Sequence, residues 1–449
     1  MSALATEPPK ERARHPLEHP DLPLQHPLLS WTKTAERTVM EVFVARQPIF
    51  DRQQKVFGYE LLFRPTVDSS YAGATDRMAS LEVITASFLS IGVEKLLGGK
   101  RAFVNFPKEL LMDDRAFSLP PSIAVIEILE SVTPEPAVIA ACRALRERGY
   151  TLALDDFSHL QGWDEMADLV SIMKVDFRAT SIAEQEALAK RYASRRISML
   201  AEKIETQEEF HRARQMGYHY FQGYFFARPD VVSRREIPGC KLAYLKILQE
   251  IHRPELEFWA IEELIQREVS LACKLLRYIN SAMFGWIKPV QSIRQALALL
   301  GEQETRNWVS LAALPILAFD KPDELIRTAL FRARFAELLA PWAGLAHRKS
   351  DLFLIGLFSV LDAVLDRPLK DTLAEMRLCG DLADTLLGSA PPVRPLPGVY
   401  HLVRAYEECR WETVAETAGR LRIPTEMIPE LYLNAVAWSD KIFREETIS

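Results

Sequence analysis

The chain has 449 residues, of which 48% are hydrophobic and 26% are charged, and this composition excludes a wholly disordered or collagen-like protein. Its formal net charge of -6 argues against general nucleic-acid binding, because proteins of that class normally carry an excess of basic residues. The five cysteines are scattered and form no CxxC pair, so we expect no zinc site, no disulfide framework and a reducing cytoplasm.

The N-terminal segment predicts a tail and no membrane anchor. Residues 1–38 begin with a stretch rich in Pro, His and Arg, which buries too little apolar area to offset its ordering entropy, so we expect a flexible tail. We interpret its histidines, His15, His19 and His26, as solvated residues and not as a metal site. The longest apolar stretches, such as residues 311–319, are shorter than the roughly 20 residues that a helix needs to cross a bilayer.

Residues 39–232 alternate between strand-like and helix-like stretches. Helix-like patterns at residues 78–97 and 135–147 separate several apolar runs, which favours parallel strands joined by helical crossovers. The nearly continuous apolar character of these runs favours a closed (β/α)8 barrel, with an open doubly wound sheet as the alternative. The predicted strands are residues 42–45, 56–63, 101–106, 123–129, 151–155, 172–176, 197–201 and 220–226.

A helical region follows the barrel. After a polar linker at residues 230–235, apolar residues recur at helical spacing, for example at Leu242, Leu245, Leu248 and Ile251. The predicted fold class is therefore α/β plus all-α, with a TIM-like barrel over residues 39–232 and a helical bundle over residues 233–449.

Oxygen-bearing side chains stand at the ends of nearly all the predicted strands. The carboxyl ends of barrel strands meet at one mouth, and burying several like charges there is costly unless cations compensate them. Ligand sets made only of oxygen suit Mg²⁺ or Mn²⁺, and two such ions can assist phosphoryl displacement. These residues favour a metal-dependent phosphate-ester hydrolase, with a purely structural acidic network as the alternative. They are Glu60, Asn105, Glu127, Glu130, Asp155, Asp156, Asp176, Glu202, Glu205 and Gln222, and the ammonium group of Lys174 stands among them.

The order of these patches resembles the EAL domain, a bacterial cyclic di-GMP phosphodiesterase module that folds as a modified (β/α)8 barrel. The Glu-x-Leu-x-Arg motif of that family matches Glu60, Leu62 and Arg64, and its upstream Gln-Pro-Ile matches residues 47–49. The resemblance covers residues 41–229.

The resemblance implies a role for each matched residue, and two Mg²⁺ or Mn²⁺ ions as cofactors. Lys174 would position or deprotonate the attacking water, and Glu130 would hold the loop that follows the aspartate pair. The implied ligands of the first metal are Glu60, Asn105, Glu127 and Asp155; Asp155 and Asp156 would share the second metal, supported by Glu202 and Glu205. The implied contacts with the dinucleotide come from Gln47, Arg64 and Gln222, with Arg64 on a phosphate.

One loop departs from the family pattern. After the aspartate pair, active members have Phe-Gly-Thr-Gly-Tyr-Ser-Ser, whereas residues 157–163 here read Phe-Ser-His-Leu-Gln-Gly-Trp. Loss of the two glycines predicts a different loop path beside the metals, because glycine reaches φ values above zero without strain. In the family this loop couples dimer contacts to metal occupancy. The departure therefore concerns binding of the second metal, turnover and formation of a homodimer. We interpret His159 as a solvent-facing residue.

The helical half resembles the HDOD domain, which is related to HD-type metal phosphohydrolases but lacks their ligands. The match is strongest at residues 274–282, Lys-Leu-Leu-Arg-Tyr-Ile-Asn-Ser-Ala, and continues to Gly301. Ser359 and Val360 stand where an HD enzyme has its His-Asp doublet, and neither can replace that pair as metal ligands. We interpret Asn280 and Ser281 as residues that cap a turn. The resemblance implies an interaction module without chemistry of its own, which binds a protein partner not yet identified.

Three hypotheses of different classes follow for the tandem protein. The barrel hydrolyses cyclic di-GMP to pGpG, or it binds the dinucleotide without cleaving it, or it is a scaffold that acts only through protein contacts. The retained carboxylates favour the first, and the altered loop at residues 157–163 favours the second.

Overall fold

The computed structural model describes residues 43–64, 96–113, 119–155, 164–195, 197–228, 239–253, 255–281, 284–285, 289–376, 378 and 380–447. The predicted tail, the linker at residues 230–235, the loop at residues 157–163 and nearly all of the predicted helix at residues 78–97 lie outside these ranges. By their internal contacts, residues 40–449 belong to one compact unit.

Eight strands close into a barrel in chain order, which confirms the predicted barrel and shows that the open-sheet alternative is wrong. The strands from β2 to β8 run parallel, but β1 pairs antiparallel with both β2 and β8, unlike the parallel arrangement predicted. Residues 51–55 form a turn that is too short for a helical crossover, so the two strands that it joins must be antiparallel. The strands are β1 (Phe43–Phe50), β2 (Val56–Arg64), β3 (Arg101–Phe106), β4 (Ala124–Ile128), β5 (Thr151–Leu154), β6 (Ile172–Asp176), β7 (Ser198–Glu202) and β8 (Tyr220–Gln222).

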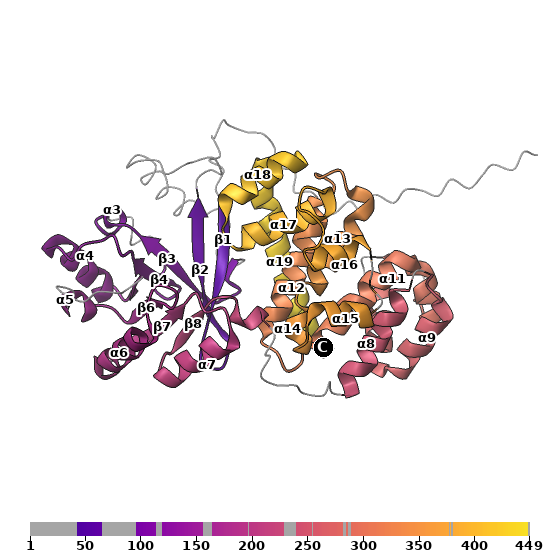
Figure 1. Cartoon of the computed structure of the whole chain (residues 1–449), viewed down its shortest axis with the longest axis horizontal. Helices are drawn as coiled ribbons and strands as arrows, with labels where there is room; N and C mark the ends of the chain where they lie inside the picture. The colour runs from indigo at the N-terminus through magenta and orange to yellow at the C-terminus, as the bar shows by residue number, and fades with distance from the viewer. Residues whose placement is uncertain are drawn as a thin grey trace, which may run out of the picture. The chain divides into compact units, whose positions relative to one another are not determined.

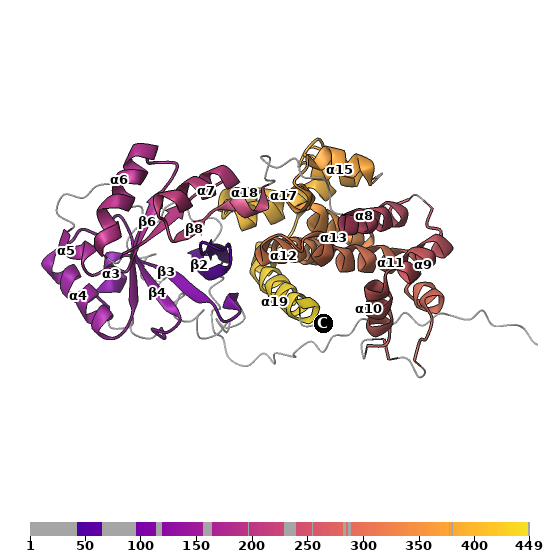
Figure 2. The same cartoon turned by 90° about the horizontal axis from the view of Figure 1, so that it is seen from below.

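Helices between the strands lie around the outside of the barrel (Figures 1 and 2). Capping boxes start two of these helices, with Ser181 and Glu184 at α6 and Thr206 and Glu209 at α7. Inside the barrel, apolar side chains from successive strands fill the interior, including Ile49, Phe103, Val125, Ala153, Ile172 and Leu200. The helices and 3-10 turns of this half are α3 (Lys108–Leu111), α4 (Pro136–Glu147), α5 (Asp164–Ala167), α6 (Ile182–Tyr192), η2 (Ala193–Arg195), α7 (Gln207–Met216) and η3 (Tyr224–Ala227).

The described residues after Gly239 form helices, as the sequence predicts. No described helix is both long enough and apolar enough to span a membrane. The elements are α8 (Gly239–Ile251), α9 (Phe258–Arg267), α10 (Val269–Ile279), α11 (Ile293–Leu317), α12 (Asp323–Leu339), η4 (Ala346–Arg348), α13 (Lys349–Phe358), α14 (Leu361–Leu365), α15 (Leu369–Glu375), α16 (Asp381–Leu386), α17 (Pro395–Glu407), α18 (Trp411–Leu421), η5 (Thr425–Met427) and α19 (Ile428–Thr447).

Strands β1 and β2 contact the helical region through the backbone and through outward-facing side chains. The Tyr406 hydroxyl of α17 donates to the carbonyl oxygen of Val44 at 3.1 Å. Arg46 Nη1 and Asp440 Oδ2 of α19 form a buried ion pair at 3.2 Å. The Tyr59 hydroxyl donates to Glu324 Oε2 of α12 at 3.1 Å. Side chains on neighbouring strand positions point to opposite faces, so residues next to these in sequence face the barrel interior.

Candidate functional site

Four carboxylates, three on barrel strands and one directly after β5, converge on one lysine. Lys174 projects from β6 and is 1% exposed, so its ammonium group lies almost entirely out of water. The distances from Lys174 Nζ are 2.6 Å to Glu202 Oε1, 2.8 Å to Asp155 Oδ1, 2.9 Å to Glu127 Oε1 and 3.5 Å to Glu60 Oε2. The carboxyl ends of strands meet at this end of the barrel, which is where barrel enzymes carry their chemistry.

Two amides donate hydrogen bonds to the carboxylate of Glu60. Asn105 Nδ2 donates to Glu60 Oε1 at 3.1 Å, and Gln222 Nε2 donates to Glu60 Oε2 at 2.8 Å. Gln222 Nε2 also donates to Gln47 Oε1 at 3.2 Å. These donors orient Glu60 and stabilise its charged form.

Burial and mutual charge perturb the pKa of each group in the cluster. Burial alone would lower the pKa of Lys174, but the four surrounding carboxylates raise it well above its usual value. Burial raises the pKa of Glu127 well above its usual value and that of Glu202 to about 8, against the opposing charge of Lys174. Burial also acts to raise the pKa of Glu60, but Lys174 and the amide donors hold it below the usual value. Such divergent values in one cluster are typical of functional sites.

An open cavity of about 430 Å³ adjoins the cluster, within the size range of small-molecule sites. Acidic and amide side chains of the cluster face it together with two cations from neighbouring loops, Arg178 and Lys203. The residues that line it are Gln47, Glu60, Leu62, Asp155, Lys174, Arg178, Glu202, Lys203, Ile204, Glu205, Gln222, Gly223 and Tyr224.

The structure places other predicted residues away from the Lys174 cluster. Glu205 lies at the cavity rim, where its Oε2 pairs with Arg178 Nη2 at 2.7 Å. Arg64, at the end of β2, pairs through Nη1 with Glu412 Oε1 of α18 at 3.0 Å and does not line the cavity. Glu130 is exposed in the turn after β4, and the loop that it was predicted to hold lies outside the described residues, as does Asp156.

The chemistry of the donor set fits a divalent cation. Four carboxylates and one ammonium group carry a formal charge of -3, and the available ligands are all oxygen atoms. Within the described ranges, the buried oxygens Asn105 Oδ1 and Glu127 Oε2 accept no hydrogen bond. The ammonium of Lys174 lies between the carboxylates, and no group of three His, Cys, Asp or Glu side chains in those ranges is arranged to hold a metal ion. A cation would therefore require these side chains to rearrange around it.

Comparisons with known proteins match both halves of the chain. Residues 74–229 match the EAL domain model, and residues 237–376 match the HDOD domain model. The uncharacterized protein YuxH of Bacillus subtilis is 35% identical over 407 residues, which cover 89% of this chain and 98% of YuxH. The cyclic di-GMP phosphodiesterase CdgJ of Vibrio cholerae is 34% identical over 413 residues, which cover 91% of this chain and 95% of CdgJ.

This chain belongs to the EAL–HDOD family. Solved structures also resemble its EAL part. BlrP1 of Klebsiella pneumoniae, in a manganese and cyclic di-GMP complex, is 25% identical with a TM-score of 0.37, and the match covers 43% of this chain and 57% of BlrP1. YkuI of Bacillus subtilis, with an EAL domain in complex with cyclic di-GMP and calcium, is 21% identical with a TM-score of 0.36, and the match covers 41% of this chain and 55% of YkuI.

In the HDOD half, Ser359 and Val360, which stand where an HD enzyme has its His-Asp doublet, make structural contacts. Ser359 Oγ accepts a hydrogen bond from Arg332 Nη1 at 3.1 Å and donates to the carbonyl oxygen of Gly356 at 2.7 Å. Val360 is fully buried. Asn280 binds the backbone of Val290 through both its side-chain oxygen and its side-chain nitrogen, which ties the end of α10 to the residues before α11.

Helices beyond the HDOD match contribute residues that sequence reasoning missed. The Tyr224 hydroxyl, at the EAL cavity, donates to the carbonyl oxygen of Glu407 at 2.9 Å. Gln47 Nε2 lies 3.8 Å from the Cys409 sulfur, in the turn between α17 and α18. No local sequence pattern marks this turn, because it meets the site only through tertiary packing.

Proposed function

We propose that the barrel domain, residues 39–232, binds cyclic di-GMP and hydrolyses one of its phosphodiester bonds to give linear pGpG. The observation that carries this proposal is the convergence of four carboxylates on Lys174 beside an open cavity at the carboxyl end of the barrel. The 34% identity with CdgJ, a protein named a cyclic di-GMP phosphodiesterase, supports the choice of substrate.

Different residues of this chain would bind the metal ion and the phosphate groups of the substrate. Glu60, Asn105, Glu127 and Asp155 would hold a Mg²⁺ or Mn²⁺ ion, which supplies positive charge to the phosphate and an activated water. Lys174 adds a fixed positive charge in a site screened from bulk water, where electrostatic stabilisation of the reacting phosphate is strongest. Arg178 and Lys203, at the cavity wall, are placed to bind phosphate oxygens.

A receptor without turnover is the second candidate, and the loop sequence at residues 157–163 favours it. That loop lacks both glycines of the active family pattern. In either case the HDOD half, residues 233–449, acts as a non-catalytic module that binds a protein partner. The formation of a homodimer is an expectation of the family resemblance alone.

The decisive experiment incubates the full chain with cyclic di-GMP in Mg²⁺, in Mn²⁺ and in EDTA, and separates pGpG by chromatography. We expect product with metal and none in EDTA. Glu60→Gln and Asp155→Asn should abolish it, whereas Glu186→Gln, an exposed substitution on α6, should retain it. Calorimetry completes the design. Binding without product selects the receptor, and absence of both binding and product selects the scaffold.

A further inference from the structure

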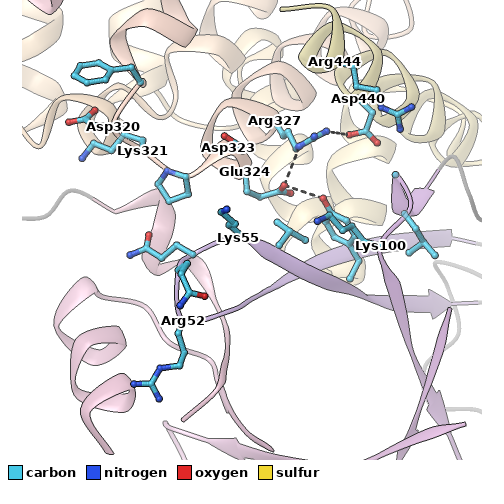
Figure 3. A pocket seen from close by; sticks show the side chains of 18 of the residues that line it. Arg52, Lys55, Lys100, Asp320, Lys321, Asp323, Glu324, Arg327, Asp440 and Arg444 are labelled. Carbon is cyan, nitrogen blue, oxygen red and sulfur yellow. Dashed lines mark hydrogen bonds and ion pairs between the residues drawn. The ribbon is translucent and has the colours of Figure 1, made fainter. Parts of the chain in front are cut away.

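A second and larger cavity lies at the opposite end of the barrel. Its volume is about 690 Å³, and its walls come from the turn before β2, the segment before β3, α7, the start of α12 and the end of α19. Figure 3 shows Lys55 and Lys100 on the barrel side and Asp320 to Arg327 on the helical side. Because parallel strands begin at this end, it is remote from the carboxylate cluster, which forms where they finish.

Basic side chains outnumber acidic ones in this cavity, by seven to four. Three of the four carboxylates already have cationic partners. Asp320 pairs with Lys241 at 2.6 Å, and Arg327 pairs with Asp440 at 2.6 Å and with Glu324 at 3.8 Å. The remaining acid is Asp323, at the exposed start of α12.

Among the described residues, two of the seven cations, Lys321 and Arg327, pair with a carboxylate. Among the described residues, Lys55, Lys100 and Arg444 form no ion pair with a carboxylate, although each lines the cavity. They come from three distant segments that only the fold brings together. The turn that carries Lys55 is fixed, because Asp51 Oδ1 accepts hydrogen bonds from the backbone N–H of Gln53 and of Lys55. Arg52 points away from the cavity and donates to the carbonyl oxygens of Arg214 and Tyr218 (Figure 3).

An aromatic ring completes the wall. Phe319, in the loop before α12, lines the cavity and is 62% exposed, so its ring is accessible from the cavity. Exposed rings of this kind are platforms for nucleobases, and uncompensated Lys and Arg groups bind phosphates.

We propose that this cavity binds a nucleotide, with its phosphates on Lys55, Lys100 and Arg444 and its base against Phe319. The site is distinct from the cyclic di-GMP site. Strand β2 borders both, because Tyr59 lines this cavity and the next residue, Glu60, belongs to the carboxylate cluster.

The test titrates the full chain in EDTA with ATP, GTP and pyrophosphate by calorimetry, since EDTA removes any metal that would hold phosphates at the carboxylate site. We expect one nucleotide per chain. The double variant Lys55→Glu/Lys100→Glu should weaken binding of all three probes at least tenfold. Phe319→Ala should weaken binding of the nucleotides and leave pyrophosphate binding unchanged.

Two control variants locate the binding. Lys370→Glu, an exposed charge reversal on α15, and Glu60→Gln, in the carboxylate cluster, should bind as the wild type does. The proposal is wrong if none of the three probes binds. It is also wrong if the double variant binds as tightly as the wild type, or if Glu60→Gln removes the binding. The pGpG assay in Mn²⁺ is scored separately, so either proposal can fail alone.

Discussion

Replacing Lys174 by methionine tests the electrostatic account of the carboxylate cluster most directly. The change keeps an unbranched side chain of similar length but removes the positive charge of Lys174, which lies within 3.5 Å of Glu60, Glu127, Asp155 and Glu202. Removing one partner of a buried ion pair typically costs about 3–5 kcal/mol, because the other charge stays buried without compensation. Here the loss falls on Glu60 above all, because Lys174 helps to hold its pKa below the usual value, so we expect a loss in the free energy of unfolding within that range.

Lys203→Met is the matched control. The side chain of Lys203 is 54% exposed and pairs with Asp176 Oδ2 at 2.5 Å, and exposed ion pairs contribute under about 1 kcal/mol. Urea unfolding in EDTA, followed by circular dichroism, compares the wild type with both variants. Mn²⁺ should restore more stability to Lys174→Met than it adds to the wild type, because the ion replaces the missing charge and binds only the folded chain. If Lys174→Met costs no more than Lys203→Met in EDTA, the cluster does not depend on this lysine and the reasoning fails.

Three further predictions concern the helical half and its contacts with the barrel. Arg46→Met should lower the free energy of unfolding in urea by about 1–3 kcal/mol, less than Lys174→Met does, because the buried carboxylate of Asp440 loses one cation but keeps Arg327 Nη1 at 2.6 Å. Burial raises the pKa of Glu324 from 4.5 to about 7, so the folded chain binds a proton that the unfolded chain lacks between these values. The stabilisation from this group is therefore complete below pH 4.5 and is lost as the pH rises through 7, by up to about 3 kcal/mol. The difference in free energy of unfolding between the wild type and Glu324→Gln should fall over the same pH range. Gly356→Ala should destabilise the fold by about 1–3 kcal/mol, since the added Cβ would lie 2.3 Å from a backbone nitrogen of α12. Gly419→Ala on α18 should stabilise the fold by about 0.5–1 kcal/mol, because no atom lies within 4 Å of the added Cβ. Equal thermal midpoints for the two variants would contradict this packing.

The sequence predicts the barrel because apolar runs bounded by turns indicate strands, and residues 172–176 coincide with β6. It does not predict the direction of β1, since periodicity indicates a strand but not its orientation. It also predicts too short a first strand, ending at residue 45, because Pro48 lacks an N–H and argues against strand structure. In the structure β1 runs on to Phe50, and pairing with β2 and β8 overrides that local preference.

For the site, residue types and strand ends give the members of the cluster but not their arrangement. That one ammonium group serves four carboxylates depends on closure of the barrel, which joins residues from four strands. The contact between Gln47 and Cys409 spans 362 positions, so no local pattern carries it. Arg64 belongs to a motif that the sequence shows directly, but its ion-pair partner could not be predicted, because Glu412 lies beyond the HDOD match.

The alternation of side chains on β1 and β2 gives the HDOD half direct access to the barrel site. Gln47 and Glu60 are register partners that face the cavity, whereas their neighbours Arg46 and Tyr59 face α12 and α19. A slip of one residue would invert every side chain on these strands, so a change of register cannot couple the helical half to the barrel. Any influence must therefore act through small displacements of side chains already in contact. Such coupling would change the turnover of Arg46→Met at a temperature where that variant is folded. It would also change the affinity of that variant for the metal ion.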